Sequence, residues 1–442
     1  MKTVVISSFH PLISRNILET SVLSRIAERG IRIVLLVPEE KKEYFVREFG
    51  TVAIVEGINV QKKRFENLLY SLSLSLVDVH NHVVDDWKVQ GRYAKYYTAH
   101  LLHALFSRFF VLHLCMRCIA HFYMRKVVFD RVFSKYKPDL VFATDVFDLS
   151  DGSLVVAASQ HGTQTVGMVR SWDNPTTKGV LLAVPEHLVV HSEVLRDELV
   201  SIHHIRADHI TVTGIPHQDA VVTWSPASRD MFFSELGLDS KKKTILFAPG
   251  GRVLYRHDGE LLALLKRLRD AGEFGDVQFL VRCPPGDQVN TIAVDSDSHF
   301  IVDLPGTRLT KRKKDSELSP SDNTRLMNSL FHSDVILTIV SSMAIDGTIF
   351  DKPVIIIGFD PPGALTDTVS KFGTNPHFKK FLDTGLVTVS RSADELVEMV
   401  QRGLKTPNWN KAERDALVKK YAYRLDGHAA ERVADAVLAH LG

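Results

Sequence analysis

Cysteine is scarce in this chain, with three in 442 residues: Cys115, Cys118 and Cys283. Three thiols are too few for a disulfide framework, so we expect a protein of a reducing compartment. Cys115 and Cys118 have the spacing of a metal or redox pair, but no second pair of ligands accompanies them, and we expect no metal site. The first residues also lack the basic, apolar and small-residue segments of a signal peptide, which predicts a cytoplasmic location.

An excess of one charge is also absent. The chain has 54 basic and 52 acidic residues and a net charge of +2, so its overall charge gives no reason to expect nucleic-acid binding. The composition, 45% hydrophobic and 24% charged, is that of a globular protein and excludes disorder and fibrous repeats. A chain of this length is long enough for two domains of about 200 residues each.

No hydrophobic run is long enough to span a bilayer, because basic residues interrupt the most apolar stretch, residues 91–137. Two interpretations of this helical stretch stay open. The basic and aromatic residues of 91–127 are typical of a segment that lies in a membrane interface, where it would meet a lipid-linked acceptor at the inner face of the plasma membrane. Alternatively, the stretch forms one or two long helices that pack on an N-terminal sheet.

The dinucleotide-binding fingerprint is missing as well. Thr3–Ser8 and Ile31–Val37 are apolar strand patterns on either side of a helical pattern, which predicts a Rossmann-like βαβ unit. The turn after the first strand contains no G-x-G-x-x-G motif. Its absence argues against a dinucleotide-dependent dehydrogenase.

What the chain does contain is a strand-turn-helix-strand pattern that begins with the apolar run Val335–Val340 and ends with Val354–Ile357. The turn after a parallel strand lies at its carboxyl end, where the free N–H groups of a helix attract anions. We expect Ser341 and Ser342 to hold a phosphate there, and Asp346, one helical turn later, to reach a sugar hydroxyl. The alternative is that a serine caps the helix and Asp346 is a surface acid.

These residues, together with Lys352 and Pro353, resemble the nucleotide-sugar signature of the GT-B glycosyltransferases. In that superfamily the hydroxyl residues and the helix N-terminus bind the donor diphosphate, and the acid binds the donor ribose. The version here, SSMAIDGTIFDKP, is especially similar to the branch that contains surface-carbohydrate glycosyltransferases and CDP-glycerol glycerophosphotransferases. The resemblance implies an α/β protein of GT-B fold, with two facing Rossmann-like domains, parallel sheets and a cleft between them.

The resemblance and the local composition together give the expected domain boundaries. A Gly-Ile-Pro turn at residues 214–216 is similar to the end of the N-terminal domain in GT-B enzymes, which implies an acceptor domain at 1–220. The irregular segment that follows, with its run of lysines, predicts a linker at 221–243, and the next strand pattern begins a nucleotide-donor domain at 244–442. In the resembling superfamily the last helix crosses back to pack on the N-terminal domain.

A glycine-bearing turn, Pro-Gly-Gly-Arg, follows the first predicted strand of the donor domain. Gly250 and Gly251 permit close approach of the backbone to a ligand, and Arg252 is suited to pair with a phosphate. Such a turn is also ordinary loop chemistry. We include it among the donor-binding residues because it is expected to face the turn at Ser341 and Ser342 in the same domain.

The candidate catalytic base is His161. With the glycine that follows, it resembles the His-Gly element of the glycerophosphotransferase branch, in which the histidine is assigned as base, and an imidazole titrates near neutral pH. The alternative is a histidine that interacts with a helix C-terminus. Asp173, in an SWDN motif, is the second candidate catalytic residue. The acid-rich loop at residues 145–151 does not match a D-x-D metal motif, so we expect a metal-independent mechanism.

The resulting expectation is a glycosyltransferase that moves a sugar from a nucleotide-sugar donor, expected to be UDP-linked, to a cell-surface polysaccharide or lipid-linked acceptor. No separate cofactor is expected. Three alternatives stay open: a CDP-alditol (glycerol or ribitol) phosphotransferase, a UDP-sugar 2-epimerase, and a non-catalytic GT-B scaffold subunit. Their products differ, because glycosyl transfer releases a nucleoside diphosphate, phosphotransfer releases CMP, and epimerisation releases an isomerised sugar.

Overall fold

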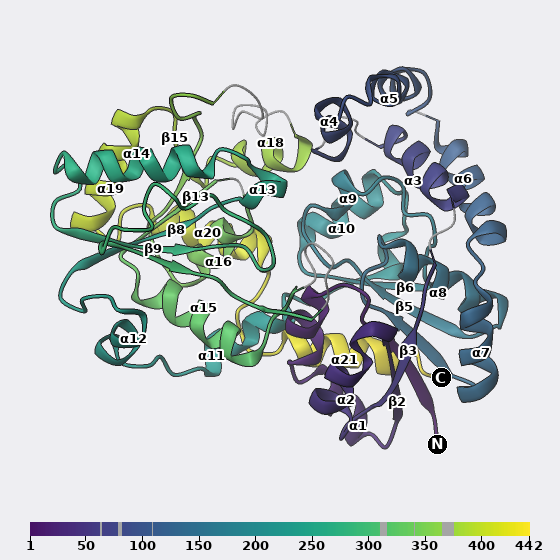
Figure 1. The fold of residues 1–442 in the computed structure, drawn as a ribbon. Coiled ribbons are helices and arrows are strands. Elements are labelled where there is room, and N and C mark those ends of the chain that lie inside the picture. Colours follow the sequence, from purple (N-terminus) through teal and green to yellow (C-terminus); the bar gives the residue numbers. More distant parts are fainter. Residues whose placement is uncertain (62–63, 78–81, 108, 310–315, 340, 365–374) are drawn as a thin grey trace. The chain divides into compact units, whose positions relative to one another are not determined.

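The computed structural model describes the chain except for residues 62–63, 78–81, 108, 310–315, 340 and 365–374 (Figure 1). It divides into two compact units. The N-terminal unit comprises Met1–Thr223 and Lys420–Gly442, and the C-terminal unit comprises Trp224–Lys419.

The N-terminal unit is built on a seven-stranded parallel sheet. Its strands are β1 (Thr3–Ser7), β2 (Arg32–Pro38), β3 (Ile54–Ile58), β4 (Leu140–Ala143), β5 (Gln164–Met168), β6 (His187–Val190) and β7 (Ile210–Val212). They lie in the order β3-β2-β1-β4-β5-β6-β7. Since the order reverses between β1 and β4, loops on the carboxyl side of these two strands diverge, which is where ligands bind in open parallel sheets.

Helices cover both faces of this sheet, and for that reason its central strands are continuous apolar runs (Figure 1). The α-helices are α1 (Val22–Glu28), α2 (Lys42–Phe49), α3 (Arg64–Ser75), α4 (His82–Val89), α5 (Tyr93–Phe106), α6 (Phe110–Tyr123), α7 (Val127–Tyr136), α8 (Leu149–Gln160), α9 (Asn174–Thr177), α10 (Glu193–Ser201), α11 (Asp219–Thr223) and α21 (Ala429–Ala439). Short helical turns are η1 (Ser14–Leu18), η2 (Glu39–Lys41), η3 (Ala207–His209) and η4 (Pro216–Gln218).

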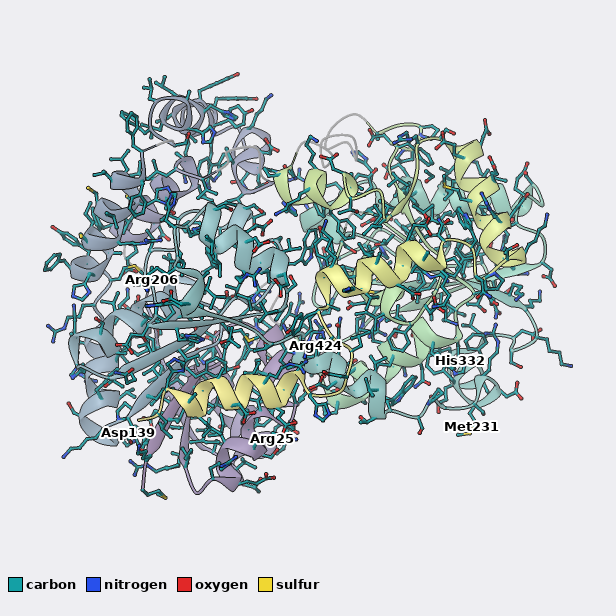
Figure 2. The ribbon with its side chains drawn as sticks, turned by 180° about the vertical axis from the view of Figure 1, so that it is seen from behind. Arg25, Asp139, Arg206, Met231, His332 and Arg424 are labelled. Atoms are coloured by element: carbon teal, nitrogen blue, oxygen red, sulfur yellow. The ribbon has the colours of Figure 1, made fainter. Side chains whose placement is uncertain are left out.

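The last helix of the chain, α21, is part of the N-terminal unit. Successive residues of β1 point to opposite faces, so Val4 packs with Val433 of α21 while Val5 packs with α7 on the other face. Arg25 of α1 forms a 2.8 Å ion pair with Glu431 of α21, and Figure 2 shows Arg25 beside this helix.

The apolar stretch 91–137 folds as three separate helices, α5, α6 and α7, rather than one or two long ones. Phe129 and Phe133 of α7 enter the core of the N-terminal unit, whereas α5 and α6 keep many large apolar side chains exposed. Among the described residues, no helix is both long enough and apolar enough to cross a membrane.

The C-terminal unit is built on a six-stranded parallel sheet. Its strands are β8 (Lys243–Ala248), β9 (Val277–Arg282), β10 (Phe300–Asp303), β13 (Val335–Thr338), β14 (Val354–Ile357) and β15 (Thr388–Ser390), in the order β10-β9-β8-β13-β14-β15. A two-stranded antiparallel ladder joins β11 (Thr307–Arg308) and β12 (Ser316–Glu317). The predicted apolar run ended at Val340, which lies outside the described residues. Two α/β units with parallel sheets confirm the predicted fold class.

Helices again cover both faces of the sheet (Figure 1). They are α12 (Arg229–Leu236), α13 (Gly251–Leu254), α14 (Asp258–Asp270), α15 (Pro320–His332), α16 (Met343–Ile349), α18 (Pro376–Leu382), α19 (Ala393–Lys405) and α20 (Lys411–Tyr421), the last of which extends past the end of the unit.

The connection between the units is shorter than the predicted linker at 221–243. Ser228 accepts the N–H of Met231 (3.3 Å) and starts α12 inside this segment. Phe232 and Phe233 of α12 are buried in the core of the C-terminal unit, with 3% and 0% of their surface exposed. These aromatic side chains hold residues from Trp224 onward in the C-terminal unit.

Candidate functional site

The two turns predicted to hold the donor phosphate lie next to each other. Strands β8 and β13 are neighbours, with Ala248 opposite Thr338, so the turns that follow them start from adjacent points at the carboxyl edge of the sheet. The Thr338 hydroxyl donates to the carbonyl oxygen of Ala248 (3.1 Å) and lies 3.0 Å from Oγ of Ser341. A Cβ on Gly250 would lie 2.3 Å from Cδ1 of Ile339, so only glycine fits between the turns.

The serine turn combines a capping contact with exposed groups. The Oγ of Ser341 accepts the N–H of Met343 (3.2 Å), so Ser341 caps the start of α16, as in the alternative interpretation. Ser342 is exposed and its side chain makes no capping hydrogen bond. Asp346 lies partly exposed in the first turn of α16. The hydroxyl and carboxyl groups of this turn therefore sit at the carboxyl edge, near solvent.

Gly250 and Gly251 form an anion-binding nest. Gly250 is in the right-handed helical region (φ −76°, ψ −24°) and Gly251 in the left-handed one (φ +75°), a pairing that points successive N–H groups at one spot. Both N–H groups donate to the carboxylate of Asp258, over 3.0 and 2.7 Å. A Cβ on Gly251 would lie 2.6 Å from Cγ of Pro284 and 2.7 Å from Oδ2 of Asp287, so this turn requires its glycine.

A cavity of about 620 Å³ lies beside this turn, entirely within the C-terminal unit. Loops at the carboxyl ends of β8, β9 and β10 line it. Arg252 and Arg256 contribute positive charge to the lining, while Asp258 and Asp287 contribute negative charge and Asn290 an amide. The volume and the mixed lining are those of a small-molecule site. Arg252, predicted from the sequence, thus borders the cavity next to the nest.

The carboxyl edge of the N-terminal sheet is polar and buried. The hydroxyl of Ser7 donates to Asp151, and Nε of Arg170 donates to Asp145 over 2.7 Å. Burial raises the pKa of Asp145, against the lowering effect of Arg170. Burial and the neighbouring carboxylates of Asp148 and Asp145 raise the pKa of Asp151 well above its ordinary value.

Asp173 lies at the same edge, at the end of the loop that joins β5 to α9. Its carboxylate accepts hydrogen bonds from the hydroxyls of Ser171 and Thr177, the second over 3.0 Å. The neighbouring Trp172 contacts the ring of Tyr421 edge to face, with 6.0 Å between centroids. Asp173 is therefore a positioned, half-buried carboxylate on the edge where ligands bind, while Trp172 packs on the C-terminal segment of its own unit.

His161, the predicted base, lies at the amino edge of the same sheet. It ends α8 and precedes β5, whose five residues span about 16 Å. Its Nε2 lies 3.0 Å from Oδ1 of Asp130, and its ring stacks on Phe133 at 4.7 Å. A ligand at the carboxyl edge is out of reach of this imidazole, so its position matches the alternative interpretation, a structural histidine at a helix end.

Two other histidines lie at the carboxyl edge, and the sequence analysis did not single them out. His191 follows β6 and is 6% exposed, and its Nε2 has no hydrogen-bond partner in the described part of the chain. Burial and the charge of Arg170 lower the pKa of His191 to about 4. Burial, Arg15 and His191 lower the pKa of His217, which follows β7. The sequence signal for His191 is its place directly after a predicted strand, and the signal for His217 is its place directly after the Gly-Ile-Pro turn.

Within the described ranges, no group of three or more His, Cys, Asp and Glu side chains has a metal-binding arrangement. Asp145, in the acid-rich loop, is instead paired with Arg170. Cys115 and Cys118 are exposed free thiols on α6. The nest, the arginines and the serine turn are residues of the C-terminal unit that could stabilise negative charge.

Two Rossmann-like units with polar carboxyl edges define the GT-B class of fold. Solved structures with this fold include UDP-GlcNAc 2-epimerase from Methanocaldococcus jannaschii (13% identity, 99% of this chain and 100% of that chain, TM-score 0.56). They also include S. aureus MnaA with UDP (12% identity, 100% of this chain and 97% of that chain, TM-score 0.57). A third is the wall teichoic acid polymerase TagF (12% identity, 100% of this chain and 88% of that chain, TM-score 0.52). At these identities the likeness shows the fold alone.

The chain belongs to the CDP-Glycerol:Poly(glycerophosphate) glycerophosphotransferase family, whose sequence profile matches residues 148–439, more than half of its length. Membership in this family indicates a transferase. No curated protein matches the sequence significantly. The branch named in the sequence analysis is thus confirmed, while the nucleotide-sugar donor and the acceptor expected there stay predictions.

Proposed function

We propose that this protein is a transferase that takes its transferred group from a nucleoside-diphosphate-linked donor and passes it to a surface-polymer acceptor. The observation that carries the proposal is the adjacency of the glycine nest at Gly250 and Gly251 with the serine turn at Ser341. Backbone N–H groups, hydroxyls and the Arg252 guanidinium at one sheet edge suit a diphosphate.

The reaction that family membership favours is phosphotransfer from a CDP-alditol. The acceptor hydroxyl would attack the phosphorus that carries the alditol, the bond from this phosphorus to the bridging oxygen would break, and CMP would leave. Negative charge then builds on the CMP phosphate. The nest and Arg252 would stabilise this charge as it develops, without a metal.

The second candidate is glycosyl transfer from a nucleotide sugar, expected to be UDP-linked. The observation that favours it is the position of His161. In the phosphotransferase branch the histidine of the His-Gly element is assigned as the catalytic base, whereas His161 lies at the amino edge of its sheet, away from the edge where ligands bind. In this reaction the bond from the anomeric carbon breaks and a nucleoside diphosphate leaves. Asp346 would contact the donor ribose, and the serine turn its diphosphate.

For the acceptor side, we propose Asp173 as the general base. It follows β5 at the carboxyl edge, and the hydroxyls of Ser171 and Thr177 fix its orientation. Positioning by hydrogen bonds is what a proton acceptor needs. Replacement by asparagine keeps the shape and removes the basicity, so Asp173→Asn should lower turnover and leave donor binding intact.

Product analysis with a donor panel tests the function. The protein is incubated with CDP-glycerol, CDP-ribitol and UDP- and GDP-sugars, with and without a polyol-phosphate or saccharide acceptor, and the released nucleotide is identified. CMP supports phosphotransfer, and UDP or GDP supports glycosyl transfer. An isomerised sugar without transfer would indicate an epimerase, and nucleotide binding without any product would indicate a scaffold subunit; either result contradicts the proposal.

We also propose that α5 and α6 contact an anionic membrane surface, where lipid-linked acceptors lie. Tyr93, Tyr97, Leu101 and Leu105 recur every four residues on α5 and are 54% to 61% exposed. Residues 87–129 contain no Asp or Glu, which leaves the surrounding charge basic. An apolar stripe flanked by cations fits the interface of a bilayer with anionic lipids.

Vesicle sedimentation tests this contact. The whole protein should bind vesicles that contain phosphatidylglycerol more strongly than vesicles of phosphatidylcholine, and Leu101→Ser with Tyr97→Ser should reduce binding about tenfold. Met231→Ser is the control, since Met231 is 63% exposed on α12 (Figure 2). Equal binding by all variants, or a dimer in solution that the double variant dissociates, would contradict a membrane contact.

A further inference from the structure

The anion in the glycine nest is the chain's own carboxylate. Oδ1 of Asp258 accepts the N–H of Gly250 and Oδ2 accepts the N–H of Gly251, so both donors of the nest are used by one side chain. Asp258 itself is 2% exposed, yet it lines the 620 Å³ cavity. A carboxylate held by two backbone N–H groups has the same hydrogen-bonding pattern as a phosphate in such a nest.

This carboxylate is surrounded by charges of both signs. Burial raises the pKa of Asp258 to about 7 against the lowering effect of the two N–H groups, and Asp287 and Glu260 raise it further. The other charged and titratable groups around it are Arg252 and Arg256 in the cavity lining, His257 beside it in the chain, and Tyr255 and Cys283. Desolvation thus makes Asp258 a poorly stabilised anion in spite of its two hydrogen bonds.

A donor phosphate is a stronger competitor for the same N–H groups. It carries more charge than a carboxylate, it has additional oxygens, and the arginines that border the cavity can pair with it. The two anions cannot share the nest, because two negative groups on the same pair of N–H donors repel each other.

We propose that Asp258 is an internal competitor of the donor phosphate: the two exchange on the N–H groups of Gly250 and Gly251, and donor binding requires Asp258 to give up this contact. The inference rests on the proposed donor site. It gives Asp258 a regulatory role at that site, in which protonation of the carboxyl group opens the nest.

The exchange makes donor affinity depend on pH in a defined direction. Below the pKa, Asp258 is neutral and no longer competes as an anion. Above the pKa, its ionised form must be displaced. With a pKa of about 7, the dissociation constant should therefore rise about fivefold from pH 7 to pH 8, and the slope approaches tenfold per pH unit at higher pH. Because the pKa of Asp258 is raised in the folded protein, the free energy of unfolding should also fall as pH rises from 4 to 7.

Calorimetric titration of the whole protein with CDP, UDP and inorganic pyrophosphate tests the exchange. The wild type should bind more weakly at pH 8 than at pH 7, with net proton uptake when buffers of different ionisation enthalpy are compared. Asp258→Asn should bind about tenfold more tightly than the wild type at pH 8 and lose this slope. Asp270→Asn, at the exposed far end of α14, is the control and should behave as the wild type.

The outcomes separate this inference from the proposed function. If no nucleotide or pyrophosphate binds to the wild type or to Asp258→Asn, the donor site itself is wrong. If ligands bind the wild type without proton uptake, and Asp258→Asn binds equally or more weakly, the exchange is wrong. The protein then binds the ligand through groups other than the nest N–H groups, and Asp258 is a positioning residue of the turn. Proton uptake by the wild type tests the exchange even if the variant fails to fold.

Discussion

The carboxyl edges of the two sheets use charge in opposite ways. In the N-terminal unit the charged side chains satisfy each other, as in the buried pair of Arg170 and Asp145. In the C-terminal unit, arginines, carboxylates and amides border a cavity of about 620 Å³ beside the glycine nest. Both sheets have parallel strands and helices on both faces, so the difference comes from the turns.

The comparison teaches that fold topology alone does not create a phosphate site. A turn binds an anion when its N–H groups point at one spot, which Gly250 and Gly251 achieve through a left-handed residue. At the corresponding edge of the N-terminal unit, Ser7 is used by Asp151 and by the N–H of Thr144 (3.0 Å). We therefore expect substitutions at the edge of the N-terminal sheet to change the stability of the protein. Substitutions at the edge of the C-terminal sheet should instead change ligand binding.

The largest expected effect is on stability. Arg170→Ala should lower the free energy of unfolding by about 3–5 kcal/mol, because it leaves the buried carboxylate of Asp145 unpaired. Chemical denaturation measures this loss. Arg206→Ala removes one partner of an exposed pair with Asp208 and should leave the denaturation midpoint unchanged (Figure 2). Equal effects of the two substitutions would contradict a stabilising role for the buried charges at the edge of the N-terminal sheet.

The next effect is on donor binding. Gly251→Val places a side chain against Pro284 and Asp287 and forces a β-branched residue into a left-handed conformation, so we expect nucleotide affinity to fall about a hundredfold. Gly272→Val is the matched control: its φ is +80°, but no atom lies within 4 Å of its Cβ. Both variants strain the backbone, but only Gly251→Val also adds a steric contact. The difference in their nucleotide affinities therefore measures the effect of that contact. Retained affinity in Gly251→Val would place the phosphate elsewhere.

A smaller effect is expected for the arginine beside the nest. Arg252→Ala should weaken binding of a nucleoside diphosphate about tenfold, because this is the usual contribution of one hydrogen bond to a charged group. The exposed Arg267 of α14 provides a control with the same loss of charge. Similar weakening in both variants would mean that the general positive field, rather than a direct contact, attracts the donor.

The smallest effect is expected at His161. His161→Ala removes a stacking contact and an ion pair at the amino edge, and we expect turnover within about twofold of the wild type, since such half-exposed contacts contribute little. Steady-state rates of His161→Ala and Asp173→Asn, measured side by side, decide which edge carries the base. Loss of turnover in His161→Ala, with the fold intact, would restore the first prediction.

Several features of this site were predictable because they depend on local pattern. The turn after Thr338 and the glycine pair after Ala248 each follow an apolar run, and parallel strands bring their carboxyl ends to one edge. The place of His161 also follows from local pattern. His161 precedes the strand Gln164–Met168, and a residue directly before a parallel strand lies at the amino edge of the sheet.

Other contacts could not be predicted, because they depend on tertiary packing. Arg170 meets Asp145 only after β4 and β5 have paired, and the two residues are 25 positions apart. Asp258 is seven positions from Gly251, and its carboxylate accepts the N–H of Gly251 only once the chain between them has folded back and α14 has begun at Asp258. Sequence pattern indicates which edge binds a ligand, whereas the partner of each charge follows from the packing.

A crystal structure of the whole protein with CDP or UDP tests the central claim most directly. We predict that the diphosphate lies within hydrogen-bonding distance of the N–H groups of Gly250 and Gly251, beside Ser341 and Arg252, with the carboxylate of Asp258 no longer in the nest. A nucleotide bound only at the edge of the N-terminal sheet, or a diphosphate with no contact to either turn, would contradict the account.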